Sequence, residues 1–272
     1  MSINYPAHRG RALAARACGT SIGMTLGGVL GGTFFASLGY CSVFVLFAVI
    51  SLLAIPMALI FKEARDHSRE DSSQLRFISV LSYSRPLFNL VCNAVCDLHL
   101  MALEPTLAIK LRTDFGLTTS QIGVFFFLFG LGSALSMALV LLLPEHWDKK
   151  KISAPAMVLM AVFTFLVGPS SLLYLPNSPV LIGAGILLGG ACRGVCCSLC
   201  PTDAVVGGIR KFPLEEARVS DIVGSMYNLL YGVASLLFPI AGSALVKSVG
   251  FRSGFDIISI GLLINATVYL AQ

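Results

Sequence analysis

Long apolar runs alternate with short polar connections along the whole chain, and eight of these runs are long enough to be membrane spans. A helix that crosses the hydrocarbon core of a bilayer, roughly 30 Å thick, needs about 20 mostly apolar residues. Runs of this kind predict spans at 17–38, 42–61, 86–109, 119–143, 153–174, 179–200, 221–246 and 254–271. The pattern therefore predicts an all-α membrane protein with about eight transmembrane helices.

Composition supports this class and excludes several others. Hydrophobic residues make up 56% of the 272 residues and charged residues only 12%, with a mean hydropathy of +0.84. A soluble domain carries about a quarter charged residues, so an ordinary soluble enzyme, a disordered chain and a nucleic-acid-binding protein are excluded. The sequence holds no phosphate-binding glycine loop followed by lysine, no His-x-x-x-His pair and no nucleophile elbow. We therefore expect no enzyme activity, no cofactor and no metal.

The cysteines fit packing better than metal binding. Cys192, Cys196 and Cys200 recur every four residues, with Cys197 beside them, in one apolar run. Tetrahedral thiolate sites exist, but four thiols on one helix would need ligands from elsewhere for good geometry. A buried cysteine also behaves as a small hydrophobe that lets helices approach closely.

Basic residues divide unequally between the two sets of connections and set the orientation. One side holds 14 of the 19 basic residues, in the N-terminus, 62–85, 144–152 and 201–220. The other side holds Lys110, Arg112, Lys247 and Arg252, and Arg193 lies within a span. Basic residues mark cytosolic loops, so both termini are expected in the cytosol.

The third predicted span carries polar side chains on one helical face. At about 100° per residue, Asn89, Asn93, Asp97 and Glu104 share that face. Because a carboxylate facing lipid is costly, the stripe should face the bundle interior or a water-filled path. Two acids on one face could bind a cation or exchange it for a proton; the alternative is a packing stripe whose acids pair with a neighbour. Pro105 has no backbone N–H, which predicts a local irregularity beside Glu104.

Each of the other polar groups within the spans could either take part in binding or pack within the protein. Arg193 could bind an anionic substrate, or pair with Asp97 or Glu104, which is favoured because a lone buried cation is expensive. His99 is expected to be a packed histidine rather than a proton relay. The aromatic and amide groups of a later span could hold a cationic amine by cation–π contact or pack in the core: Tyr227, Asn228 and Tyr231.

An internal repeat relates the two ends of the chain. When the sequence is shifted by 211 positions, Ser37-Leu-Gly-Tyr40 overlies Ser248-Val-Gly-Phe251 and Gly31 overlies Gly242. The first two spans then correspond to the last two within a repeated six-helix unit. This predicts that four helices are missing from the front, with 1–61 ending an N-terminal half, 62–85 a cytosolic linker and 86–272 a C-terminal half.

Two motifs then carry a resemblance to a known family. The glycine run from 23 to 32 resembles the antiporter motif G-x-x-x-G-P-x-x-G-G of the major facilitator superfamily, with Gly28 in place of its proline. A degenerate copy of the motif follows later in the chain. The motif positions in the two copies are Gly23, Gly27, Gly28, Gly31, Gly32, Pro239 and Gly242. Within that superfamily, Leu103-Glu104-Pro105-Thr106-Leu107 resembles a seventh-helix motif of the vesicular amine transporter (solute carrier 18-like) group.

The resemblance implies a function and a place in the cell. It implies the major facilitator fold without its first four helices, and a proton-coupled exchanger of small organic cations such as amines or polyamines. The protein would be a multi-pass protein of a vesicular, endomembrane or plasma membrane. Cys196 and Asn228 stand where the amine transporters have carboxylates, which leaves a different amine or another organic cation open. The alternative is a truncated, non-transporting membrane protein that acts through helix contacts.

Overall fold

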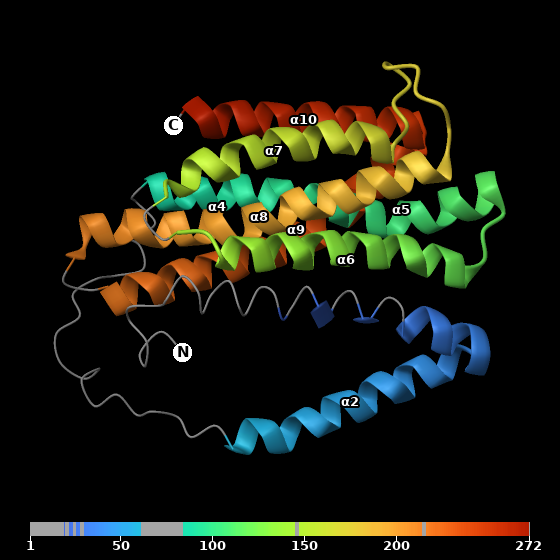
Figure 1. Cartoon of the computed structure of the whole chain (residues 1–272), viewed down its shortest axis with the longest axis horizontal. Coiled ribbons are helices and arrows are strands. Elements are labelled where there is room, and N and C mark those ends of the chain that lie inside the picture. The colour runs from blue at the N-terminus through green and yellow to red at the C-terminus, as the bar shows by residue number, and fades with distance from the viewer. Residues whose placement is uncertain are drawn as a thin grey trace.

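The structure is a computed structural model that describes residues 19, 22–23, 26–27, 30–60, 84–144, 147–213 and 216–271. Within these ranges the chain is built of helices joined by short turns (Figure 1). Residues 30–38 are helical, and the labelled helices are α2 (Tyr40–Ile60), α4 (Ser84–Cys96), α5 (Leu98–Phe115), α6 (Thr119–Leu141), α7 (Lys149–Val167), α8 (Pro179–Lys211), α9 (Glu216–Val249) and α10 (Phe251–Ala271).

Six helices of the described chain are long and apolar enough to cross a membrane. They correspond to the last six predicted spans, with α4 and α5 together forming the first of them, Arg85–Phe115. The predicted span 42–61 is the helix α2. The predicted span 17–38 lies partly outside the described residues, and its end, 30–38, is helical.

Several helix ends differ from the predicted span ends, because an apolar run marks the bilayer whereas backbone capping marks the helix. The carboxylate of Asp148 accepts a hydrogen bond from Lys150 N at 3.1 Å, which starts α7 four residues before the predicted position 153. α7 then ends at Val167 rather than 174. Most of the predicted connection 201–220 is helical, since α8 continues to Lys211 and α9 begins at Glu216.

One pair of residues that the predicted repeat superposes has the same backbone conformation in the structure. Gly39 and Gly250, which the 211-residue shift superposes, both have a positive φ, 83° and 87°. Each donates its N–H to a carbonyl four residues earlier, Gly39 to Phe35 at 3.1 Å and Gly250 to Val246 at 2.9 Å. A new helix begins directly after each glycine. The same left-handed helix end, which favours glycine, therefore joins the first pair of helices and the last pair.

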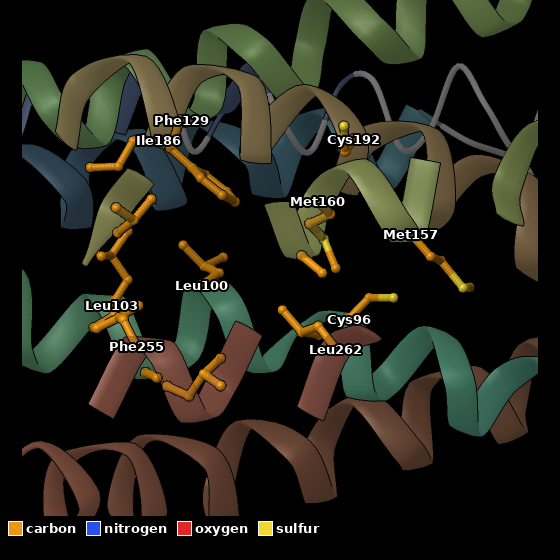
Figure 2. Packing of buried hydrophobic residues seen from close by; sticks show 14 of the residues in the cluster. Cys96, Leu100, Leu103, Phe129, Met157, Met160, Ile186, Cys192, Phe255 and Leu262 are labelled. Carbon is orange, nitrogen blue, oxygen red and sulfur yellow. The ribbon is translucent and has the colours of Figure 1, made fainter. Parts of the chain in front are cut away.

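The helices α4 to α10 pack as one bundle with α8 at its centre, in contact with α4, α6, α7 and α9. Glycines allow this packing: a Cβ on Gly132 of α6 would lie 2.1 Å from Leu187 O, and a Cβ on Gly190 of α8 would lie 2.5 Å from Phe129 O. Figure 2 shows the main buried cluster, to which Cys96, Phe129 and Met160 contribute. By contrast, α2 lies apart from the bundle, with most of its described side chains exposed (Figure 1).

Candidate functional site

The helix that carries the predicted polar stripe is interrupted at Asp97. α4 ends at Cys96 and α5 begins at Leu98, and between them the Asp97 N–H bonds the carbonyl of Ala94 at 3.1 Å, three residues back instead of four. The predicted irregularity was therefore misplaced: the helix runs through Pro105 without interruption. The break instead coincides with the most deeply buried acid, since Asp97 is 0% exposed.

Asp97 forms a buried ion pair with Arg193 of α8. Both Nε and Nη2 of Arg193 lie 2.7 Å from Asp97 Oδ1. The guanidinium carbon also lies 5.8 Å from the centre of the Phe129 ring, a cation–π contact. Asp97 was one of the two acidic partners that the sequence left open for Arg193. Because the two charges cancel, the pair can be buried together, whereas either charge alone would be strongly unfavourable.

The stripe continues toward the beginning of α4 through two asparagines. The Asn89 side chain donates from Nδ2 to Asp203 Oδ2 of α8 at 2.6 Å. Asn93 lies one turn after Asn89 and is 1% exposed, and neither of its amide atoms has a hydrogen-bond partner among the described residues. Three of the four predicted stripe residues, Asn89, Asn93 and Asp97, thus lie buried between helices.

Asp203 is a candidate that the sequence analysis missed. The predicted span stopped at Cys200, which placed Asp203 in a connection, but α8 carries it to within hydrogen-bonding distance of Asn89. A signal was present in the sequence. From Pro201 to Ile209 the acid is flanked by small and apolar residues, and the first basic residue is Arg210. This is the pattern of a continuing helix rather than a polar loop.

Glu104 differs from the other stripe residues because it is exposed and makes no ion pair with a described side chain. The acids Asp97, Asp114 and Asp203 all have partners, namely Arg193, Lys110 and Asn89. The close approach of Gly242 on α9 to Ala102 brings α9 against this part of α5, since a Cβ on Gly242 would lie 2.6 Å from the Ala102 Cβ. Glu104 therefore lies on the bundle surface beside the α5–α9 contact.

The aromatic candidates on α9 lie near the same groups. The rings of Tyr227 and Tyr231 stack with centroids 6.4 Å apart and an interplanar angle of 24°. Both tyrosines are close enough to Arg193 to interact with its charge, and Tyr231 is also close enough to Glu104. Asn228 points elsewhere, being exposed on α9. The structure thus brings Tyr227, Tyr231 and the Asp97–Arg193 pair together and leaves Asn228 outside.

His99 is a packed histidine in the structure. It is 0% exposed, its Nδ1 lies 2.8 Å from Thr164 Oγ1 of α7, and a Cβ on Gly189 would come within 2.9 Å of its Nε2. Thr164 Oγ1 donates to Met160 O at 2.7 Å. The hydroxyl oxygen is then free to accept from an Nδ1–H of His99, which assigns the proton to that nitrogen.

The cysteines pack between helices. Six of them, Cys92, Cys96, Cys192, Cys196, Cys197 and Cys200, are buried and free. The residues that the structure describes contain no group of three or more histidine, cysteine or acidic side chains arranged to hold a metal ion.

The antiporter-like glycine motif is described in part. Gly28 lies outside the described residues, and a Cβ on Gly23 or Gly27 would meet nothing within 4 Å. Gly31 faces Val43 and Phe47 of α2, at 3.9 Å from a Cβ placed on it. A Cβ on Gly32 would lie 4.0 Å from the Cα of Gly123 in α6. In the repeated copy, Pro239 lies within α9 and Gly242 packs on Ala102.

Comparisons with known proteins agree with this architecture. Residues 4–202 match the family model described as Major Facilitator Superfamily. Three curated relatives are each named MFS-type transporter SLC18B1: the rat protein (Rattus norvegicus, 24% identical over 237 residues), the mouse protein (Mus musculus, 24% over 239) and the human protein (Homo sapiens, 22% over 237). Each alignment covers 86% of this chain and 51% of the relative. The chain therefore spans about half the length of these curated relatives.

Proposed function

Because the chain belongs to the major facilitator superfamily of membrane transporters, we propose that the whole protein exchanges small organic cations, such as amines or polyamines, for protons. The observation that carries this proposal is the contrast between two acids on one helix. Asp97 forms a hydrogen-bonded ion pair with Arg193, whereas the carboxylate of Glu104 forms no ion pair within the described residues, although it lies close enough to Arg193 to interact with its charge. A carboxylate without a fixed counter-ion is free to take a proton or a substrate cation in turn.

The surroundings of Glu104 suit an organic cation. The stacked pair Tyr227 and Tyr231 offers aromatic faces near Glu104 and Arg193, and aromatic faces attract ammonium groups. The fixed charge of Arg193 would repel a cation, but Asp97 cancels it. The site therefore combines an acid that forms no ion pair with aromatic surface, a combination that suits a protonated amine.

The proposed domain division follows the repeat. We assign 1–61 to the end of the N-terminal half, 62–85 to a cytosolic linker and 86–272 to the C-terminal six-helix half. The matching glycine turns at Gly39 and Gly250 support this division, as does the single bundle that α4 to α10 form. In transporters built from repeated halves, the substrate site lies near the midplane where the halves meet. We propose that Glu104 faces that meeting surface.

Transport assays in proteoliposomes test the proposal. The whole protein should accumulate labelled serotonin or labelled spermidine when the vesicle interior is acidic, and an agent that collapses the pH gradient should prevent this. Exchange of labelled for unlabelled substrate at equal pH is the control for a working binding site. The proposal is wrong if neither probe is taken up or if uptake ignores the gradient.

The competing function is a membrane protein that does not transport and acts through helix contacts. The exposed apolar side chains of α2, such as Leu52 at 63% and Leu53 at 65%, favour it. The same assay separates the two functions. Binding of the probes without any flux, together with stable association with another membrane protein, would support the alternative.

A further inference from the structure

A continuous row of polar side chains lies inside the α4–α8 interface. At one end Asn89 donates to Asp203 at 2.6 Å, and at the other Arg193 pairs with Asp97 at 2.7 Å. As the residue number rises on α4 it falls on α8, so the two helices run antiparallel. Asn89 and Asp97 are eight residues apart, which corresponds to about 12 Å along a helix. The row therefore reaches from the interior of the bundle to the last turns of α8.

The centre of this row contains polar atoms without partners. Both amide atoms of Asn93 and the Oδ2 atom of Asp97 are buried, and none of the three has a hydrogen-bond partner in the described part of the chain. Asn93 lies midway between the two bonded pairs, one turn from Asn89 and one turn from Asp97. Buried polar atoms of native proteins are nearly always hydrogen-bonded, to protein or to ordered water. Three such atoms on adjacent turns at one helix interface point to a bound ligand.

The chemistry of these groups selects the ligand. Asn93 offers a donor and an acceptor, while Asp97 Oδ2 accepts. The Asp97–Arg193 pair has no net charge, so it attracts neither an anion nor a cation. A metal ion at this place would also be repelled by the nearby guanidinium of Arg193. Water donates and accepts, and it typically makes about three hydrogen bonds when buried.

We propose that ordered water molecules fill the α4–α8 interface from Asp203 to Asp97 and bind to Asn93 on the way. If the proposed proton exchange holds, on which this role rests, the water file is the route by which protons pass between the end of α8 and the centre of the bundle. A proton would move along hydrogen-bonded water between the two carboxylates, with no redox step. Among the described residues, other charged or titratable groups near the route include Arg193, Cys197 and Tyr227 at the inner end, and Tyr269 and Arg85 toward the outer end. The thiols of Cys96 and Cys200 lie between the two ends.

A native thiol reports on the water file in the chain itself. Cys197 Sγ lies 3.9 Å from Asp97 Oδ1, at the inner end of the row. Infrared spectroscopy of the purified chain in lipid nanodiscs follows the S–H stretching band of Cys197, assigned by its loss in Cys197→Ala, after transfer to D2O. The unsubstituted chain should exchange this proton rapidly. Asn93→Leu should slow the exchange roughly tenfold or more, because exchange must then wait for local opening of the helices.

Conservative variants separate the water file from mere packing. Asn93→Ser keeps a polar group and should keep rapid exchange. At the other end, Asp203→Leu should slow exchange while Asp203→Asn, which keeps a hydrogen-bonding side chain, should not. If Asn93→Leu fails to fold, the two Asp203 variants still test the proposal. Unchanged S–H bands of the other buried cysteines show that a variant has folded normally.

The results decide the proposal independently of transport. Slow exchange of Cys197 in the unsubstituted chain would overturn it, and so would equal exchange rates in the unsubstituted chain and both leucine variants. A whole protein that fails to transport contradicts the proposed function but leaves these exchange rates as they are. The expected result is rapid exchange in the unsubstituted chain, slower exchange in both leucine variants and rapid exchange in both polar variants.

Discussion

Arg193 and Asp97 form a charge pair whose two partners come from different helices and are both almost completely buried, with side chains 7% and 0% exposed. Removing one partner leaves the other as an uncompensated buried charge. The pair therefore ties α8 to the junction of α4 and α5, and it leaves Glu104, on the same span, without an ion pair among the described residues.

Arg193→Gln should destabilise the chain by about 3 to 5 kcal/mol, the usual cost of breaking a buried ion pair from one side. The double variant Arg193→Gln with Asp97→Asn should recover much of this loss, because it removes both charges. Thermal unfolding of the purified chain in detergent measures both effects. If the double variant were as unstable as the single one, the pair would not be what holds these helices together.

The crossing of α6 and α8 depends on the absence of a side chain at Gly190. A Cβ there would lie 2.5 Å from Phe129 O, so Gly190→Ala should cost about 1 to 3 kcal/mol or more of stability. Gly261→Ala on α10 is the matched control, since a Cβ at Gly261 meets nothing within 4 Å. Equal unfolding temperatures for the two variants would contradict the described packing.

The uneven distribution of basic residues predicts the orientation in the membrane. Of the 19 basic residues, 14 lie in segments that should face the cytosol. A cysteine introduced at Ser68 should react with an impermeant thiol reagent only from the cytosolic side, and one introduced at Thr113 only from the opposite side. Labelling of position 68 from outside intact cells would reverse this topology.

Six of the predicted spans and the matching glycine turns could be predicted from the sequence, because both depend on patterns that the bilayer and the helix ends impose. Apolar run length follows membrane thickness, and the glycines at 39 and 250 are needed at left-handed turns. The break at Asp97 and the position of Asp203 could not be predicted in the same way. The break occurs where α8 supplies Arg193 as a partner, and α8 continues to Lys211, eleven residues past the predicted end of the apolar run at 200.

The site prediction was correspondingly uneven. A face drawn on an uninterrupted helix grouped Glu104 with Asn89, Asn93 and Asp97. In the structure the first three are buried and Glu104 is exposed, since α8 packs along α4 and hardly touches α5. Because Asp97 is buried in an ion pair and Glu104 is exposed, substitutions of the two acids test different roles.

Asp97→Asn should impair gradient-driven uptake less than loss of Glu104 does. The asparagine still accepts a hydrogen bond from Arg193, although it leaves the guanidinium charge without compensation. His99→Ala should leave uptake nearly unchanged, because His99 contacts Thr164 and Gly189 rather than the α5–α9 surface. Uptake by the three single variants in the same proteoliposome preparation ranks these roles, and a strong defect in His99→Ala would contradict the ranking.

The most direct test of the proposed function is uptake by the whole protein carrying Glu104→Gln, compared with Asp114→Asn on the same helix. Glutamine keeps the size and hydrogen-bonding capacity of Glu104 and deletes its titratable charge, while Asp114 is an acid already paired with Lys110. Glu104→Gln should insert normally into the membrane yet reduce gradient-driven uptake to the level of protein-free vesicles, whereas Asp114→Asn should transport like the unsubstituted protein. Normal gradient-driven uptake by Glu104→Gln would contradict the assignment of Glu104 as the group that exchanges cation and proton.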